Sequence, residues 1–128
     1  NCSQEILALG TPLIWWSAII ALGVLVGFVV SRRDKRGALI LLGVAAGYLP
    51  WFAFQQRTVF SFYSIVFEPF IILTLTYVIG LSQQRYKTYI YGFFIAVGLC
   101  FLYFLPIYIA QTMTYDDWHA RMWFSSWI

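Results

Sequence analysis

Residues 55–80 read QQRTVFSFYSIVFEPFIILTLTYVIG, an apolar run that carries an arginine near its start and one glutamate near its middle. A carboxylate inside lipid costs several kcal/mol unless it is compensated, so Glu68 needs a structural or functional reason. At α-helical spacing, Ser61 and Ser64 connect Arg57 to Glu68 along one face. The sequence therefore predicts a helix that is apolar around most of its circumference and polar along one line, like the wall of a groove.

Pro69 directly follows Glu68 and is expected to kink this helix. Proline has no N–H to donate, so inside a helix it leaves the carbonyl of Ile65 without its partner. The kink and the carboxylate are therefore predicted to coincide.

The composition is that of an integral membrane protein. Of the 128 residues, 62% are hydrophobic and only 10% are charged, far from the balance of an ordinary soluble domain. The net charge of +3 does not indicate nucleic acid, because the basic residues lie in short loops and form no stripe with interleaved aromatics. Cys2 and Cys100 are the only cysteines, and no metal-ligand spacing is present. We expect membrane lipid as a partner, with no nucleic acid, no metal and no cofactor in this chain.

Four apolar segments approach the roughly 20 residues that a helix needs to cross a bilayer: 11–30, 38–54, 59–81 and 88–110. Thr11 and Pro12 suit the N-cap and the first position of the first helix. Gly43 and Gly47 form a small-xxx-small pattern that lets a neighbouring helix approach the second one closely. The predicted fold class is an all-α membrane protein, with one four-helix transmembrane module over residues 1–128.

The last segment, 111–128, is too short and too polar to span and predicts a short amphipathic helix at the membrane interface. Asp116 or Asp117 is expected to cap it, which explains these residues better than a metal site does. Its apolar side chains are expected to point to lipid: Trp118, Met122, and Trp123 or Trp127. Its polar side chains are expected to face water: His119 and Arg121.

The basic residues predict the orientation in the membrane. Six of the eight lie in the loops 31–37 and 82–87, whereas Arg57 and Arg121 are the only ones on the other side. Because loops rich in lysine and arginine stay in the cytoplasm, these two loops are expected to be cytoplasmic. Both ends of the chain and Arg57 are then expected to face outward.

Four stretches, in this order, resemble the C-terminal four-helix membrane region of protein O-mannosyltransferases, particularly the actinobacterial kind. They are TPLIWW at 11–16, AGYLPWF at 46–52, RTVFSFYSIVFEPFIILTLTYVIG at 57–80 and WHARMWFSSWI at 118–128. The resemblance covers nearly the whole chain, and its expected outward C-terminus agrees with the orientation derived from charge.

The resemblance implies a polytopic glycosyltransferase of the GT-C class in a bacterial plasma membrane. Such enzymes transfer mannose from a polyprenyl phosphate to Ser or Thr hydroxyls of exported proteins, with inversion at the sugar. Their catalytic acidic pair lies on an outward loop far upstream. The chain is therefore expected to be a fragment of a longer enzyme, inactive alone and without a catalytic residue. Its implied partners are the N-terminal transmembrane part of that enzyme, the lipid-linked mannose donor and the acceptor protein.

Arg57 is the candidate for binding the donor phosphate, because a guanidinium grips phosphate through two parallel hydrogen bonds and stays charged at any pH. The alternative is an interfacial arginine that reaches lipid headgroups. The candidate groove-lining residues are Ser61, Tyr63, Ser64 and Glu68. For Glu68, an interhelical polar contact competes with a catalytic role. For Tyr63, ordinary packing competes with lining.

Two other functions remain open from the residues alone. A small four-helix transporter could couple proton or cation movement to the intramembrane carboxylate of Glu68. A structural or assembly module in the membrane would need neither Glu68 nor Arg57 for chemistry. Proton flux that depends on Glu68 would indicate the transporter, and a donor analogue that crosslinks near Arg57 would exclude a purely structural role.

Overall fold

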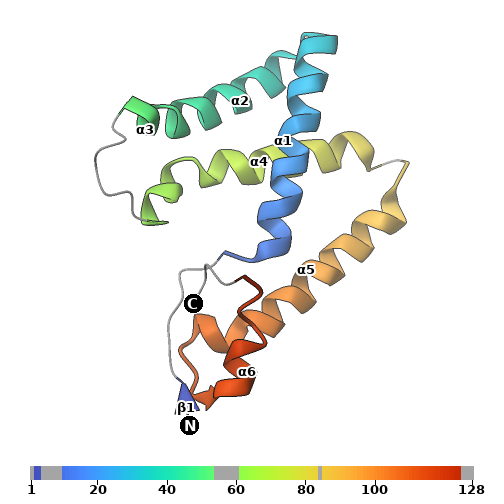
Figure 1. The fold of residues 1–128 in the computed structure, drawn as a ribbon. Coiled ribbons are helices and arrows are strands. Elements are labelled where there is room, and N and C mark those ends of the chain that lie inside the picture. The colour runs from blue at the N-terminus through green and yellow to red at the C-terminus, as the bar shows by residue number, and fades with distance from the viewer. Residues whose placement is uncertain (1, 4–9, 54–60, 84, 125–128) are drawn as a thin grey trace.

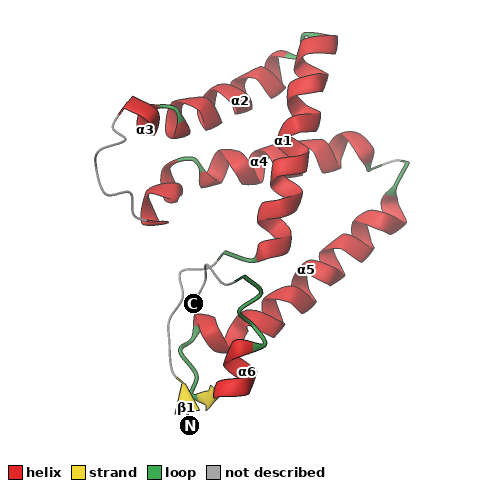
Figure 2. Cartoon of the chain, in the orientation of Figure 1, coloured by secondary structure: helices red, strands yellow, loops and turns green. Residues whose placement is uncertain are grey.

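A computed structural model describes residues 2–3, 10–53, 61–83 and 85–124, and the structural statements below concern these residues. Figures 1 and 2 show a chain of crossing helices with one very short strand pair. The main helices are α1 (Pro12–Arg32), α2 (Lys35–Tyr48), α4 (Glu68–Ser82) and α5 (Lys87–Tyr108). The short elements are α3 (Pro50–Ala53), the 3-10 helix η1 (Ser61–Val66), α6 (Tyr115–His119), and the antiparallel strands β1 (Cys2–Ser3) and β2 (Met113–Thr114).

Length and composition make three helical stretches able to cross a membrane: Pro12–Arg32, Lys35–Ala53 and Lys87–Tyr108. The helix Glu68–Ser82 is equally apolar in character but has only 15 residues. The predicted all-α membrane-type fold is confirmed at this level.

Helix α1 begins where the sequence predicts. Thr11 occupies the N-cap and Pro12 the first turn, where a missing N–H does no harm. The Thr11 carbonyl accepts hydrogen bonds from the backbone N–H of Ile14 at 3.0 Å and of Trp15 at 3.3 Å, whereas the Thr11 side chain makes no capping bond. The hydroxyl of Thr11 is therefore not used by the helix.

The paired glycines of α2 allow α4 to pack against it, as the small-xxx-small pattern predicts. A Cβ atom at Gly43 would overlap the ring of Phe70, and one at Gly47 would lie 2.7 Å from the Cβ of Phe67. In Figure 1, α2 and α4 lie side by side, and α1 contacts both. The centre of this three-helix unit holds fully buried residues of α1 and α4, namely Leu25 and Thr74.

Asp34 joins the loop after α1 to both α2 and α4. Its carboxylate caps α2 by accepting the Gly37 N–H at 2.7 Å, and it accepts the Tyr77 hydroxyl of α4 at 2.6 Å. The hydrogen bond from Tyr77, followed by that from Gly37, lowers the pKa of Asp34 below its usual value. Because the pKa is lower in the folded protein than in the unfolded chain, the stabilisation is complete at neutral pH and is lost as pH falls through the folded pKa.

Tyr77→Phe is expected to lower the thermal midpoint at pH 7. It is also expected to make the midpoint fall less steeply as the pH is lowered. Without the Tyr77 hydroxyl, the folded and unfolded pKa values of Asp34 approach each other, so less stability remains to be lost below about pH 4. Thermal unfolding of the reconstituted protein from pH 3 to pH 7 measures both effects. Tyr89→Phe is the matched control, because Tyr89 is 78% exposed and does not contact Asp34. Parallel pH curves for wild type and Tyr77→Phe would contradict the role given to this hydrogen bond.

The third predicted helix, 59–81, differs from the structure over its first part. Residues 61–66 form the 3-10 helix η1, and the α-helix begins only at Glu68. Pro69 then lies in the first turn of α4, the one part of a helix where proline is well tolerated, and not at a kink in the middle. The Phe67 N–H bonds to Ser64 three residues back, at 3.1 Å, which is the 3-10 pattern. The α-helical stripe predicted from Ser61 to Glu68 is therefore wrong.

The C-terminal segment packs against α5, and the prediction that its apolar residues face lipid is wrong for Trp118 and Met122. Both are buried, at 8% and 7% exposed, in a cluster with Phe104 and Ile107. The cap of α6 is Thr114, which accepts the Asp117 N–H at 3.3 Å, and not one of the two aspartates. Trp127 lies outside the described residues.

Arg121 holds this segment in place. Its Nε donates to the Tyr103 carbonyl at 2.9 Å, and its guanidinium lies 4.9 Å from the centre of the Tyr103 ring. In return, the Tyr103 hydroxyl donates to the Ala120 carbonyl at 3.0 Å. Arg121 is thus partly buried against protein, and it does not simply face water as predicted.

Candidate functional site

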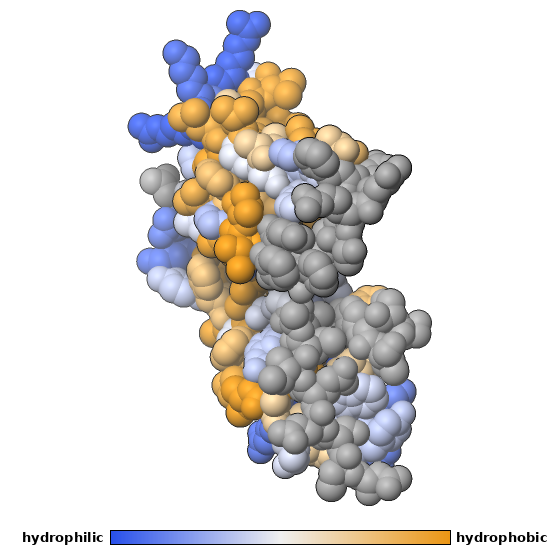
Figure 3. All heavy atoms as spheres, turned by 90° about the vertical axis from the view of Figure 1, so that its left-hand side faces the viewer, coloured by the Kyte–Doolittle hydropathy of each residue, from blue (hydrophilic) through white to orange (hydrophobic). Residues whose placement is uncertain are grey.

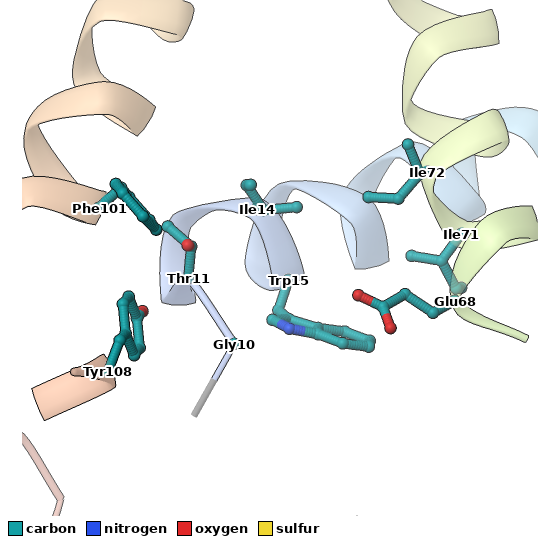
Figure 4. Close-up of a pocket in the computed structure, with 9 residues that line it drawn as sticks. All are labelled: Gly10, Thr11, Ile14, Trp15, Glu68, Ile71, Ile72, Phe101 and Tyr108. Atoms are coloured by element: carbon teal, nitrogen blue, oxygen red, sulfur yellow. The ribbon is translucent and has the colours of Figure 1, made fainter. Parts of the chain in front are cut away.

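A cleft of about 330 Å³ lies where the start of α1, the start of α4 and the end of α5 come together. Figure 4 shows it with α5 at the left, α1 in the middle and α4 at the right. Its lining residues are Gly10, Thr11, Ile14, Trp15, Glu68, Ile71, Ile72, Phe101 and Tyr108. The walls are mainly apolar, and polar groups are few, which is the usual character of a small-molecule site.

Glu68 supplies the charge in the cleft. It is the first residue of α4, where the partial positive charge of the helix start stabilises a carboxylate. In Figure 4 its carboxylate points from α4 toward the indole of Trp15. Within the described part of the chain, no hydrogen bond or ion pair to this carboxylate is found. Glu68 is therefore a half-buried acceptor that the described residues leave open to a ligand.

The indole of Trp15 lies between Glu68 and Gly10 in the cleft. Its indole is folded back against Gly10 so closely that a Cβ atom at Gly10 would overlap it. Only glycine allows this approach, because any other residue would push the ring aside. The position of Trp15 in the cleft thus depends on Gly10.

The other end of the cleft is built by α5. Phe101 and Tyr108 stand on either side of the Thr11 hydroxyl in Figure 4. The Tyr108 oxygen is buried, and no group in the described residues meets it with hydrogen-bond geometry. This end therefore combines two aromatic rings with two hydroxyl groups, those of Thr11 and Tyr108, which are neighbours of each other.

Of the two predicted groove residues whose side chains the structure describes, Glu68 lines the cleft and Ser64 does not. Ser64 is half-buried in η1 and is not among the lining residues. The side chains of Ser61 and Tyr63 fall outside what the structure describes, and so does Arg57 as a whole. These three assignments stay predictions.

Trp15, Thr11 and Tyr108 were not predicted as site residues. The sequence marks Trp15 as one of two interfacial aromatics before the first span, and this signal does not distinguish it from Trp16. The structure does distinguish them, because Trp16 points instead to Trp123, with ring centres 6.1 Å apart. The two neighbouring tryptophans thus face different surroundings.

Comparison with known proteins finds similar sequences that match this chain over almost its whole length. It is 30% identical over 137 residues to a polyprenol-phosphate-mannose–protein mannosyltransferase of Mycolicibacterium smegmatis, covering 99% of this chain and 27% of that protein. Proteins with the same name from Mycobacterium tuberculosis and Corynebacterium glutamicum are 29% and 31% identical, each again covering 99% of this chain and 26% of the relative. No family model and no solved structure matches the chain.

The chain therefore spans about a quarter of the length of the curated relatives that it matches. The matched part carries all four sequence stretches on which the resemblance to protein O-mannosyltransferases was based, so that resemblance is confirmed. Over 99% of its length, the chain is a homologue of a C-terminal portion of the polyprenol-phosphate-mannose–protein mannosyltransferases.

Proposed function

We propose that this chain is the C-terminal membrane region of a protein O-mannosyltransferase that transfers mannose from polyprenyl-phosphate-mannose to Ser or Thr of exported proteins. The observation that carries the proposal is the similarity of the whole chain to mannosyltransferases from three actinobacteria. In the proposed enzyme, this region completes the helix bundle and helps to bind the lipid-linked donor. The catalytic carboxylate that takes the proton of the acceptor hydroxyl belongs to the other part of the enzyme.

The proposal includes four membrane spans. Helix α4 with its 15 residues measures about 22 Å at the α-helical rise, and the six residues of η1 add about 12 Å at the 3-10 rise. Together these lengths, about 34 Å, exceed the roughly 30 Å of a hydrocarbon core. A fourth span made of a 3-10 segment and a short α-helix is therefore long enough.

The arrangement of the helices supports the proposed orientation. In Figure 1 the junctions α1–α2 and α4–α5 lie toward the upper right, whereas α6 and strand β1 lie toward the lower left. Figure 3 shows strongly hydrophilic side chains at the upper end, where the α1–α2 junction lies, with apolar surface below them. The basic loops 31–37 and 82–87 would then face the cytoplasm, and the cleft beside Glu68 would open on the outward side with the donor.

The transporter alternative depends on the carboxylate of Glu68, which begins α4 and lines an open cleft. Proton flux into liposomes that is abolished by Glu68→Gln would favour the transporter over the mannosyltransferase.

The proposed function is tested by mannosyl transfer in a reconstituted system. The full-length enzyme that contains this chain is expected to transfer mannose from polyprenyl-phosphate-mannose to a Ser- or Thr-containing peptide. An enzyme that folds and binds membranes but transfers no mannose from this donor would refute the proposal.

Arg57→Ala in that enzyme is expected to raise the KM for the donor by about 10-fold or more, because charge-assisted hydrogen bonds to phosphate contribute roughly 1.5–3 kcal/mol. Arg57→Lys is the matched control. It keeps the positive charge but loses the two parallel hydrogen bonds, so an intermediate KM is expected. Thermal stability should stay near that of the wild type in both variants. Unchanged donor KM and turnover in Arg57→Ala would leave Arg57 as an interfacial residue only.

A further inference from the structure

We propose that the cleft beside Glu68 is a pyranose subsite that holds the mannosyl ring of the donor, with Trp15 under the ring and Glu68 accepting hydrogen bonds from its hydroxyls. This inference rests on the proposed function. It adds Trp15, which the sequence pattern does not assign, and it gives Glu68, predicted only to line a groove, a role in binding the sugar. It concerns recognition of the sugar and not of the phosphate.

The chemistry of the lining residues suits a sugar. One face of a pyranose carries C–H groups with a slight positive charge, and these pack well on the negative face of an indole. The rim of the same ring carries hydroxyl donors, for which a carboxylate is the strongest acceptor. Trp15 and Glu68 come from different helices and point toward each other in Figure 4, so one ligand can touch both. The Thr11 hydroxyl, which does not cap its helix, adds a group that can donate or accept.

The polarity and the size of the cleft argue against binding of the phosphate or the polyprenyl chain of the donor. A phosphate would meet the carboxyl group of Glu68, and none of the residues that line the cleft is basic. The polyprenyl chain is too large for a cleft of about 330 Å³, a volume near the lower end of known ligand sites. A single hexose is the part of the donor that matches both the size and the polarity of the cleft.

Two fixed contacts shape the subsite. Gly10 allows the Trp15 ring to fold back against the chain, and Pro69 starts α4 at Glu68, so that the carboxylate sits at the rim of the cleft. The Trp15 ring is thus placed by its contact with the Gly10 backbone, and no partner among the described residues has to leave Glu68 before a ligand can bind. This preorganisation reduces the entropy that binding would otherwise cost.

The test separates the sugar from the lipid phosphate by two measurements on the full-length enzyme. The first is the KM for polyprenyl-phosphate-mannose, and the second is the inhibition constant of polyprenyl phosphate that carries no sugar. Trp15→Leu is expected to raise the donor KM about 10-fold through lost stacking. Glu68→Gln is expected to lower kcat/KM for the donor by about 10-fold or more through the weaker acceptor. In both variants the inhibition constant of the sugar-free lipid should change by less than about twofold, because the lipid makes no contact here.

Trp16→Leu is the matched control for Trp15→Leu. It removes the neighbouring tryptophan of the same helix, which contacts Trp123 and Phe124 and does not line the cleft. Its donor KM should equal that of the wild type. Trp15→Phe should retain part of the affinity, because a smaller ring still offers an aromatic face.

Three results would overturn the inference. An equal loss of affinity for the donor and for the sugar-free lipid would mean that the cleft holds phosphate or prenyl chain. Inhibition by a mannosylated product peptide that weakens in the variants while the donor KM stays constant would assign the cleft to the acceptor side. An unchanged KM with lower thermal stability would leave Trp15 and Glu68 as packing residues. Failure of the proposed function differs from all three, since the unmodified enzyme would then transfer no mannose.

Discussion

Replacing Gly47 with valine is expected to destabilise the protein by about 1–3 kcal/mol, the range for inserting methyl groups into a packed helix contact. A Cβ atom at this position would lie 2.7 Å from the Cβ of Phe67 and 3.2 Å from its Cα. Because the second obstacle is backbone, no side-chain rotation can relieve it, and α2 and α4 must move apart. The variant should unfold at a lower temperature or detergent concentration than the wild type when both are reconstituted in the same lipid.

Two other glycines calibrate this result. A Cβ atom at Gly27 meets nothing within 4 Å, so Gly27→Val should leave stability nearly unchanged. The three atoms nearest to a Cβ atom at Gly43 all belong to the ring of Phe70, which is a side chain and not backbone, so Gly43→Ala should fall between the other two. Equal effects at Gly27 and Gly47 would mean that the close approach of α4 to α2 does not stabilise the fold.

The sequence predicts local features of this protein well where a residue is compatible with only one local structure. Thr11 and Pro12 predict the start of α1, because proline needs a helix position without an N–H partner. Gly43 and Gly47 predict a close helix contact, because only missing side chains allow it. The long apolar segments predict membrane-spanning helices, because a helix pairs all of its own backbone groups and lipid offers them no other partner.

The predicted helix over 59–81 is wrong in its first part because a proline is compatible with two local structures. Proline after Glu68 is compatible with a kink inside a helix and equally with the first turn of a new helix. The structure has the second, with η1 before it. The choice depends on how Phe67 and Phe70 pack against the glycines of α2, which is tertiary information that residues 55–80 alone do not contain.

The candidate site could be predicted only in part. Glu68 stands out in the sequence because a carboxylate in an apolar run is costly. Trp15 and Tyr108 are ordinary aromatics of membrane helices in the sequence, and only the packing of α1, α4 and α5 brings them to Glu68. The tail fails for a similar reason. Trp118 fits an amphipathic pattern, but a pattern does not say whether its apolar face meets lipid or another helix.

Phe104→Ala is expected to have the largest effect on the C-terminal segment, with a loss of about 3–5 kcal/mol from the cavity and the missing contacts. Phe104 is fully buried, and it joins Ile107 to Trp118 and Met122. Its ring centre also lies 4.9 Å from that of Trp123. Without this ring, α6 loses the surface on α5 against which it packs. Hydrogen–deuterium exchange at Tyr115–His119 should become fast, and the thermal midpoint of the protein should fall.

The matched control is Phe94→Ala, on the same helix but 56% exposed, which should not change exchange in α6. Arg121→Ala separates packing from the polar clasp. It removes the hydrogen bonds to the Tyr103 and Asp117 carbonyls and the contact with the Tyr103 ring, but it leaves the apolar cluster intact. Exchange in α6 should therefore rise less in Arg121→Ala than in Phe104→Ala, because burial of the cluster outweighs these exposed polar contacts. A larger effect of Arg121→Ala would mean that the polar contacts of Arg121, and not the buried cluster, hold the C-terminal segment on α5.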